Sequence, residues 1–216
     1  PRYRPATIVA PRCAAGLLGR KTGRGFYIYD DGVKQVPAEM PVPDLKGATR
    51  PVWISARHAD LAATLREFLA ARGAEIDTAV TPGPDSLIFL TPLGEDTTTA
   101  ALTEGVDPKR VLAVDCLVPL GRRLCLMHSP ATDPEFLDHA RGLLGGDGTA
   151  VTVIADSPGF IAQRILAMIV NIGCDIAQQK IATPSVEIKN GRVLVVITRL
   201  KIHQTSITSG NKANRN

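Results

Sequence analysis

Short apolar runs recur from residue 51 onward, and segments with helical spacing separate them. The runs predict strands at 52–55, 75–80, 86–91, 110–115, 124–128 and 150–155. The intervening segments predict helices at 59–72, at 96–103 and from Thr132 to about Leu144. Strands that alternate with helices imply parallel pairing, so residues 51–155 are predicted to form an open, parallel α/β sheet.

A long apolar helix is predicted after this sheet. Ser157 and Pro158 have the pattern of an N-cap followed by a first helical residue, and the helix is expected to reach about Gln179. Its apolar residues leave little polar circumference, so it needs burial on several sides. Because the chain offers few other helices to cover it, we expect a dimer or larger homo-oligomer, with this helix and residues 1–31 at the contact.

Composition places the chain among globular proteins. It has 216 residues, of which 44% are hydrophobic and 21% charged. No apolar stretch reaches the roughly 18 to 20 residues of a membrane span, and no secretory signal is recognisable. Cys13, Cys116, Cys125 and Cys174 lack metal-ligand spacing, so buried, reduced thiols of a cytoplasmic protein are expected. The chain begins at Pro1, and we expect it to be a piece of a longer protein.

Charge is distributed unevenly along the chain. The net charge is +4, and the segment from Ser185 onward contributes +5 of it, because six basic residues there face Glu187 alone. The preceding 184 residues therefore carry 4 − 5 = −1, which argues against nucleic-acid binding by the body of the chain. The tail, in which Gly191 to Ile202 could form a strand before a polar, mobile end, differs in composition from the body. It is either foreign to the domain or a native basic tail.

Two motifs are specific when taken together: GLLGRKTGRGFYIYDDG at 16–32 and SPGFIAQRI at 157–165. They resemble the 3-hydroxyacyl-CoA dehydrogenases, including the 3-hydroxybutyryl-CoA enzymes of fatty-acid and aromatic-acid breakdown. In that family an NAD-binding Rossmann domain precedes an all-α domain. The all-α domain opens with D-x-P-G-F-I-x-N-R and closes with G-x-K-x-G-x-G-F-Y.

The two motifs stand here in reverse order, which implies a duplicated C-terminal half. The expected organisation is the end of a first helical domain (1–32), a linker (33–50), a degenerate Rossmann-like domain (51–155), the start of a second helical domain (156–184) and a basic tail (185–216). The glycines of the first motif favour a tight turn that closes a helical domain. A phosphate-binding loop would need a strand before it and a helix after it.

The resemblance implies two substrate-binding candidates, Gly159 and Gln163. Gly159 allows close backbone approach at the start of the helix. Gln163 stands where the family has an Asn that faces the acyl substrate, and the longer amide would place its donors differently. Arg164 matches the family's Arg, for which an ion pair is expected. Acyl-CoA is the substrate that the resemblance implies for the intact enzyme.

The cofactor of the family, NAD, is not expected to bind this chain. A dinucleotide fingerprint requires glycines between the first strand and its helix, so that the backbone can approach the pyrophosphate. Ser55, Arg57 and Asp60 occupy those three positions. Asp77 or Glu75 could serve as the acidic residue that binds a ribose, but neither suffices without the glycines.

No catalytic residue can be assigned. The family uses a His–Glu pair as general base, and here the His-bearing segment is missing while Cys125 stands at the Glu position. His128 is expected in a loop after a strand, and His58 and His139 are expected to be exposed on helices. Asp115, at the end of a strand, is interpreted as structural. No metal site is expected.

Three hypotheses remain open. The chain is a C-terminal fragment of a 3-hydroxyacyl-CoA dehydrogenase whose Rossmann-like domain serves assembly, a nucleotide- or CoA-binding module with altered loops, or a non-enzymatic interaction domain.

Overall fold

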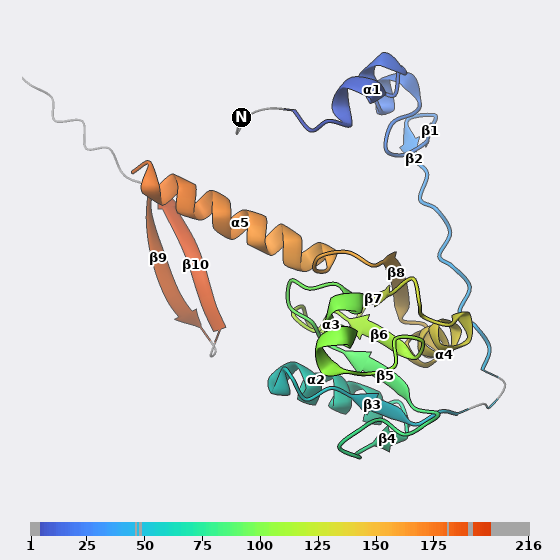
Figure 1. Cartoon of the computed structure of the whole chain (residues 1–216). Helices are drawn as coiled ribbons and strands as arrows, with labels where there is room; N and C mark the ends of the chain where they lie inside the picture. Colours follow the sequence, from blue (N-terminus) through green and yellow to red (C-terminus); the bar gives the residue numbers. More distant parts are fainter. Residues whose placement is uncertain (1–4, 46, 48, 181, 190–191, 200–216) are drawn as a thin grey trace, which may run out of the picture. The chain divides into compact units, whose positions relative to one another are not determined.

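One six-stranded sheet forms the centre of the fold in the computed structural model (Figure 1). The model describes residues 5–45, 47 and 49–180, and the backbone of 182–189 and 192–199. The strand order is β4-β3-β5-β6-β7-β8. The strands are β3 (Val52–Ile54), β4 (Ile76–Asp77), β5 (Leu87–Leu90), β6 (Val111–Val114), β7 (Arg123–His128) and β8 (Ala150–Ala155).

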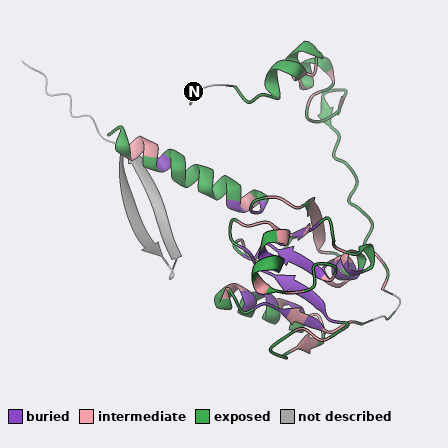
Figure 2. Cartoon of the chain, in the orientation of Figure 1, coloured by how far each residue is buried: buried purple, intermediate pink, exposed green. Residues whose placement is uncertain are grey.

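Helices cover both faces of this sheet. They are α2 (Ala59–Ala70), α3 (Thr97–Glu104) and α4 (Pro134–Gly145). On one face, Phe89 and Leu112 belong to the cluster that contains the buried residues of α2 and α4. On the other face, Ile88 and Val111 pack with α3 and with Phe160. The inner strands are therefore buried on both sides, as Figure 2 shows, which explains their uninterrupted apolar sequence.

The α/β fold predicted from the sequence is confirmed, with one difference in strand direction. All neighbouring strands of the sheet pair in parallel except β6 and β7, which are antiparallel, with Ala113 opposite Met127. The prediction of purely parallel pairing was wrong at this point. The connection from Asp115 to Arg122 is too short to hold the crossover helix that a parallel pair requires.

Two elements differ in extent from the sequence prediction. The strand expected at 75–80 contains only Ile76 and Asp77, because Asp77 accepts hydrogen bonds from the backbone of Ala79 and Gly83 and turns the chain away. The helix expected from Ser157 begins instead at Ile161, as α5 (Ile161–Gln178), with Phe160 as its N-cap residue. Gly159 has φ +72°, which is incompatible with a helix that runs through it.

Residues 5–42 belong to a separate small unit. It contains α1 (Val9–Ala14), the 3-10 turn η1 (Arg20–Thr22) and a hairpin of β1 (Tyr29–Asp30) with β2 (Val33–Lys34). Gly19 and Gly23 have positive φ, as the tight turn of the first motif requires. None of the described residues of this unit is buried, and Phe26 is 73% exposed. A unit without an internal core needs another surface to cover it.

A second hairpin follows α5. It pairs β9 (Ala182–Lys189) with β10 (Arg192–Arg199) in antiparallel register. The strand expected at 191–202 corresponds to β10, whereas β9 was not predicted. The mobile end expected beyond it lies outside the described residues, and the origin of the tail stays a prediction. Among the described residues, no helix combines the length and apolar character that would let it span a membrane.

Candidate functional site

The carboxyl edge of the sheet between β3 and β5 is the topological switch point of the fold. The chain leaves β3 toward β4 on one side and returns to β5 on the other. In open α/β sheets, ligands bind in the crevice that this reversal opens at the carboxyl ends of the strands. A dinucleotide site, if the chain had one, would lie here.

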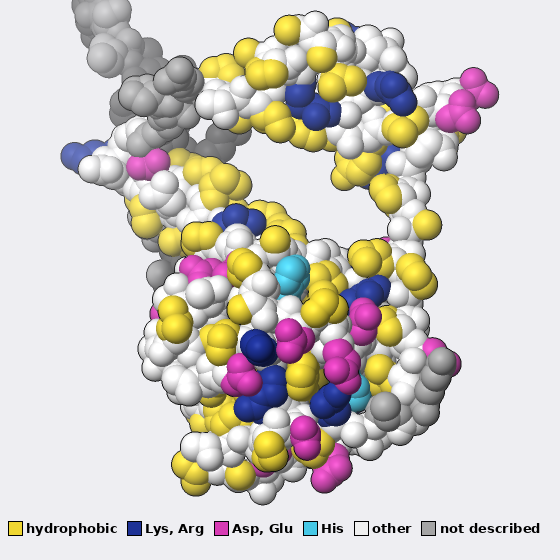
Figure 3. Space-filling model, turned by 45° about the vertical axis from the view of Figure 1, so that its right-hand side comes forward, with side chains coloured by type: hydrophobic (Ala, Val, Ile, Leu, Met, Phe, Trp, Pro, Cys, Tyr) yellow, Lys and Arg dark blue, Asp and Glu magenta, His cyan; other side chains and the backbone are white. Residues whose placement is uncertain are grey.

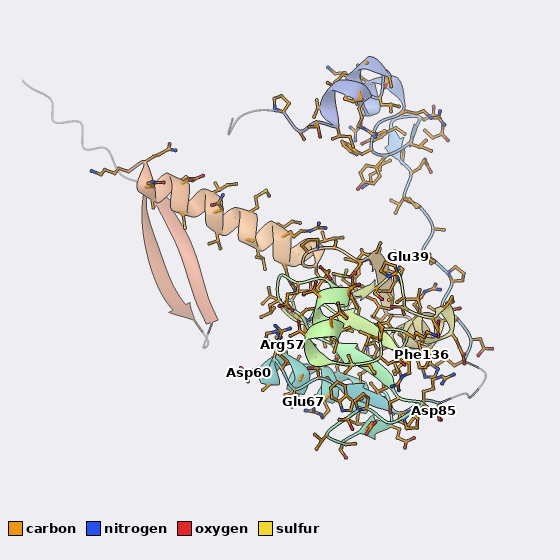
Figure 4. The ribbon with its side chains drawn as sticks, viewed as in Figure 1. Glu39, Arg57, Asp60, Glu67, Asp85 and Phe136 are labelled. Atoms are coloured by element: carbon orange, nitrogen blue, oxygen red, sulfur yellow. The ribbon has the colours of Figure 1, made fainter. Side chains whose placement is uncertain are left out.

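An ion pair occupies this position. The guanidinium of Arg57, three residues beyond β3, donates two hydrogen bonds of 2.6 and 2.9 Å to the carboxylate of Glu95, in the loop after β5. Figure 4 shows Arg57 and Asp60 at the same end of α2. The Arg57 guanidinium lowers the pKa of Glu95, chiefly through the hydrogen bond. The ion pair thus joins the loops after β3 and β5, between which a pyrophosphate would have to lie.

The surrounding residues do not fit a dinucleotide. Ser55 is buried, and its hydroxyl accepts a hydrogen bond from the backbone N–H of Arg57, which fixes the turn. Asp60 adds a negative charge in the first turn of α2, where a phosphate would need a positive field. The side chains at all three glycine positions therefore oppose close approach of a pyrophosphate.

Asp77, the candidate for ribose binding, is engaged within its own loop. Its carboxylate accepts hydrogen bonds from the backbone of Ala79 and Gly83 and from the hydroxyl of Ser86, at 2.6 to 3.0 Å. These bonds, led by that of Ser86, lower the pKa of Asp77. The residue lines an open hollow of about 750 Å³ that includes Pro51 and Ser86, directly before β3 and β5. The structure thus places Asp77 in a loop-stabilising network.

The two substrate-binding candidates lie together at the carboxyl edge. Gly159 is buried, and its backbone N–H donates to the carbonyl of Glu95. Gln163, 8% exposed, accepts a hydrogen bond from the N–H of Gly94 and donates to the carbonyl of Pro92 and to the Oδ1 of Asp115. Both residues line a mostly apolar hollow of about 320 Å³ together with Leu93. Their role toward substrate stays a prediction.

Asp115 is buried at the end of β6. Its Oδ1 accepts hydrogen bonds from Gln163 and from the N–H of Leu117, and its Oδ2 has no partner among the described residues. Burial, with the Asp115 charge as a second cause, raises the pKa of Cys116 to about 12 and that of Cys125 to about 11. Both thiols are therefore protonated and unreactive at neutral pH.

The expectation of four buried thiols was wrong for two of them. Cys116 is buried and Cys125 half-buried, but Cys13 and Cys174 are exposed. The apolar runs around Cys13 and Cys174 belong to α1 and α5, whose apolar side chains are themselves exposed. No group of three or more potential metal ligands occurs among the residues that the structure describes.

The histidines do not form a catalytic pair with any carboxylate among the described side chains. His128 is the last residue of β7 rather than a loop residue, and its Nδ1 lies 3.1 Å from the carbonyl of Ser129. His58 is the half-buried N-cap residue of α2. His139 was expected to be exposed, but it is 6% exposed, since it shares the buried face of α4 with Phe136 and Ala140.

Arg164 makes no ion pair within the described part of the chain, so the expected pair is absent there; its side chain lines the same hollow as Gln163. Over the face of the larger unit in Figure 3, Lys and Arg side chains lie among Asp and Glu side chains. That face presents no continuous basic field of the kind that nucleic acids select.

Searches against protein-family models and against curated proteins found no match. Solved structures do match, and 3-hydroxyacyl-CoA dehydrogenases are among the neighbours. The chain is similar to 3-hydroxybutyryl-CoA dehydrogenase from Escherichia coli K12, with a TM-score of 0.55 and 19% identity over 82% of this chain. Other matches are FadB2 from M. tuberculosis, with a TM-score of 0.44 and 18% identity, and (S)-3-hydroxybutyryl-CoA dehydrogenase PaaH1 from Ralstonia eutropha, with 0.43 and 16%. Each covers 82% of this chain.

The similarity concerns the fold and only part of the neighbouring proteins. The chain spans 32% of the Escherichia coli protein and 57% and 58% of the other two. The likeness in fold to 3-hydroxyacyl-CoA dehydrogenases that the two sequence motifs predicted is thereby confirmed.

Sequence reasoning missed the contacts that Gln163 and Glu95 make. Gln163 was recognised as a departure from the family pattern, and Asp115 was interpreted separately as a structural residue at the end of a strand. The available signal was that both residues were expected at the carboxyl edge of the sheet or directly after it. For Glu95 the sequence offered no such signal, because acidic residues are common in loops.

Proposed function

We propose that the chain is a C-terminal portion of a 3-hydroxyacyl-CoA dehydrogenase, of the kind that acts on 3-hydroxybutyryl-CoA with NAD in fatty-acid or aromatic-acid breakdown. In this portion, residues 51–155 support assembly and the substrate-binding helical domain and do not transfer hydride. The observation that carries the proposal is the Arg57–Glu95 ion pair at the switch point. It joins the two loops between which a cofactor would have to enter.

The lack of an assignable general base supports the same proposal. Hydride transfer to or from a hydroxyacyl group needs a positioned base as well as a bound nicotinamide. His128 is the histidine nearest in sequence to the family position, and its Nδ1 lies against a backbone carbonyl. Loss of a general base removes about 10² to 10⁴ in rate.

An activity assay tests the proposal. Purified chain is mixed with acetoacetyl-CoA and NADH, and oxidation of NADH is followed beside an intact family enzyme as the positive control. We expect no turnover above the rate without protein. Turnover within tenfold of the intact enzyme, abolished by His128→Ala, would refute the proposal and make His128 the base.

The proposal includes self-association. Seven large apolar side chains of α5 are between 43% and 55% exposed: Ile161, Ile165, Leu166, Met168, Ile169, Val170 and Ile172. Contiguous apolar surface of this kind drives association. We infer a homodimer or larger species with α5 and residues 5–31 at the contact, in a cytoplasmic enzyme whose thiols stay reduced.

Sedimentation velocity distinguishes this assembly from non-specific aggregation. Ile169→Asp is expected to convert the oligomer to monomer. Val80→Asp, a change of the same type at a 95% exposed position outside α5, should leave it intact. A clean monomer for the unmodified chain at micromolar concentration would contradict the proposed assembly.

A ligand-binding module with altered loops is the second candidate. The apolar hollow beside Gly159 and Gln163 favours it, because apolar concavities with a few polar groups are typical of ligand sites. Saturable binding of acetyl-CoA by the chain would support this candidate over a purely supporting role.

A further inference from the structure

Hydrogen bonds link the amino end of α5 directly to two strand ends at the carboxyl edge of the sheet, and through Glu95 to a third. The side chain of Gln163 by itself forms hydrogen bonds both to the loop after β5 and to the end of β6. Gly159 attaches to the carbonyl of Glu95, and the Glu95 side chain in turn binds Arg57 after β3. We call the five residues Arg57, Glu95, Asp115, Gly159 and Gln163 the edge clasp.

Each contact of the clasp is specific in geometry. The Gln163 amide uses both of its donors and one acceptor position, at 2.9 to 3.1 Å, so its orientation is fixed by three partners on two segments. Gly159, at φ +72°, lies so close to Gly94 that an added Cβ would be 3.2 Å from the Gly94 Cα. A larger residue at 159 would separate the two backbones.

The clasp also satisfies groups that would be costly to leave unpaired. The Asp115 carboxylate is 2% exposed, and Gln163 supplies one of its two hydrogen bonds. A buried acceptor that loses its donor incurs its full desolvation cost, and this cost is higher for a charged acceptor than for a neutral one. Separation of α5 from the sheet would therefore remove hydrogen-bond partners from the Asp115 carboxylate, the Gly94 N–H and the Pro92 carbonyl at the same time. Because the three bonds are lost together, the attachment is cooperative.

We propose that the edge clasp fixes the start of α5 to the sheet without a dinucleotide, with Gln163 as the positioning residue at its centre. The inference deepens the proposed supporting function and rests on it. A Rossmann-like unit whose cofactor crevice is closed by Arg57 and Glu95 still holds the first helix of the following domain in a defined place. The sheet then holds the amino end of α5 in a fixed position.

Gln163→Glu is the sharpest test, because it changes one amide nitrogen to oxygen at almost constant shape. The new carboxylate would face the Asp115 carboxylate at about 3.1 Å, where the amide now donates. Two buried carboxylates at this distance cannot both stay charged, so the pair must either share a proton or separate. Because protons become scarcer as pH rises, the clasp should be more open at pH 8 than at pH 5.

Other ionisable groups near the amide must not account for the effect. They include Glu95 and Arg57 on the loops, His58 beside Glu95, and Arg164 on α5. All four are present in the parent chain as well, so the parent chain at both pH values is the control for them. The thiols of Cys116 and Cys125 have raised pKa values and stay protonated throughout this range. A pH response confined to the variant would therefore report on the introduced carboxylate and its neighbour Asp115.

Amide hydrogen exchange of the full chain supplies the measurement. The backbone N–H groups of Gly94 and Gly159 both donate within the clasp. In Gln163→Glu, their protection factors should fall by about tenfold or more at pH 8 and recover at pH 5. Those of Phe89 and Leu112 in the central strands should not change. Gln178→Glu, at an exposed position near the end of the same helix, should show no effect at either pH.

Gln163→Asn keeps the experiment decisive if Gln163→Glu does not fold at pH 8. The shorter neutral amide cannot reach Gly94 and Asp115 together, so protection at Gly94 and Gly159 should fall at both pH values. Protection within twofold of the parent chain in the variant that folds would overturn the clasp. Saturable NADH binding by the parent chain would instead refute the proposed function, and the two failures are thereby distinguishable.

Discussion

A methyl group added to Gly159 would lie 3.2 Å from the Cα of Gly94, at a backbone φ of +72°. A substitution of Gly159 is therefore unfavourable for two reasons. Residues with a Cβ disfavour this φ, and the neighbouring backbone leaves little room for the Cβ. For Gly148, at φ +88°, only the first reason applies, because nothing lies within 4 Å of its Cβ position.

Gly159→Ala should destabilise the chain by about 2 to 4 kcal/mol, and Gly148→Ala by about 1 kcal/mol. Urea unfolding followed by circular dichroism gives both values. Equal losses for the two variants would show that the approach of Gly159 to Gly94 contributes nothing.

The amino end of α3 has a second cap besides its N-cap residue Asp96, whose carboxylate accepts a hydrogen bond from the N–H of Thr99. Asp156, after β8, accepts hydrogen bonds from the backbone N–H groups of Thr97 and Thr98 and from the Thr98 hydroxyl. Asp156→Ala should cost about 1 to 2 kcal/mol in unfolding free energy. Asp133→Ala is the matched control, since Asp133 is the N-cap of α4 but makes no side-chain capping bond. If the two variants lose the same stability, Asp156 does not act as a cap.

Stability should depend on His139 between pH 7.5 and 5.5. Burial lowers the pKa of His139, with Arg50 as a second cause, so below the unfolded pKa of about 6.5 the unfolded state binds more protons than the folded one. The stability of the chain therefore falls as pH drops through this window. The carboxylates with lowered pKa, such as Asp77, lose their contribution only at lower pH.

His139→Gln should flatten this part of the pH profile, measured as the thermal midpoint at constant ionic strength. An unchanged slope in the variant would mean that another group controls the decline.

Thiol labelling should separate the cysteines by burial. Because the pKa values of Cys116 and Cys125 are raised to about 12 and about 11, neither should react with iodoacetamide at pH 8 while the chain is folded. All four cysteines should react in denaturant, as mass spectrometry can show. Rapid labelling of Cys116 in the folded chain would contradict its burial.

The sheet could be predicted from the sequence because its strands are apolar on both faces and their runs are bounded by turn residues. Phe89 and Leu112 needed no knowledge of partners to be assigned as buried. The direction of β7 could have been inferred from the short connection after Asp115, but the alternation of strands and helices elsewhere suggested a parallel sheet.

The site was harder to predict, because its contacts join residues far apart in the chain. Arg57 is 38 residues from Glu95, and Gln163 is 48 from Asp115. Sequence reasoning identified Arg57 as an obstacle to a pyrophosphate by its bulk, whereas the structure adds that its charge is engaged by Glu95. His139 was misjudged because its polarity outweighed its position on the apolar face of α4.

The central claim is that the switch point of this sheet is closed by Arg57 and Glu95 and has no place for a dinucleotide. Calorimetric titration of the full chain with NADH tests it most directly. We predict no saturable heat under conditions that would detect a Kd of about 1 mM, which corresponds to about −4 kcal/mol. Saturable binding tighter than this, lost in Arg57→Ala, would contradict the account and make Arg57 a phosphate ligand.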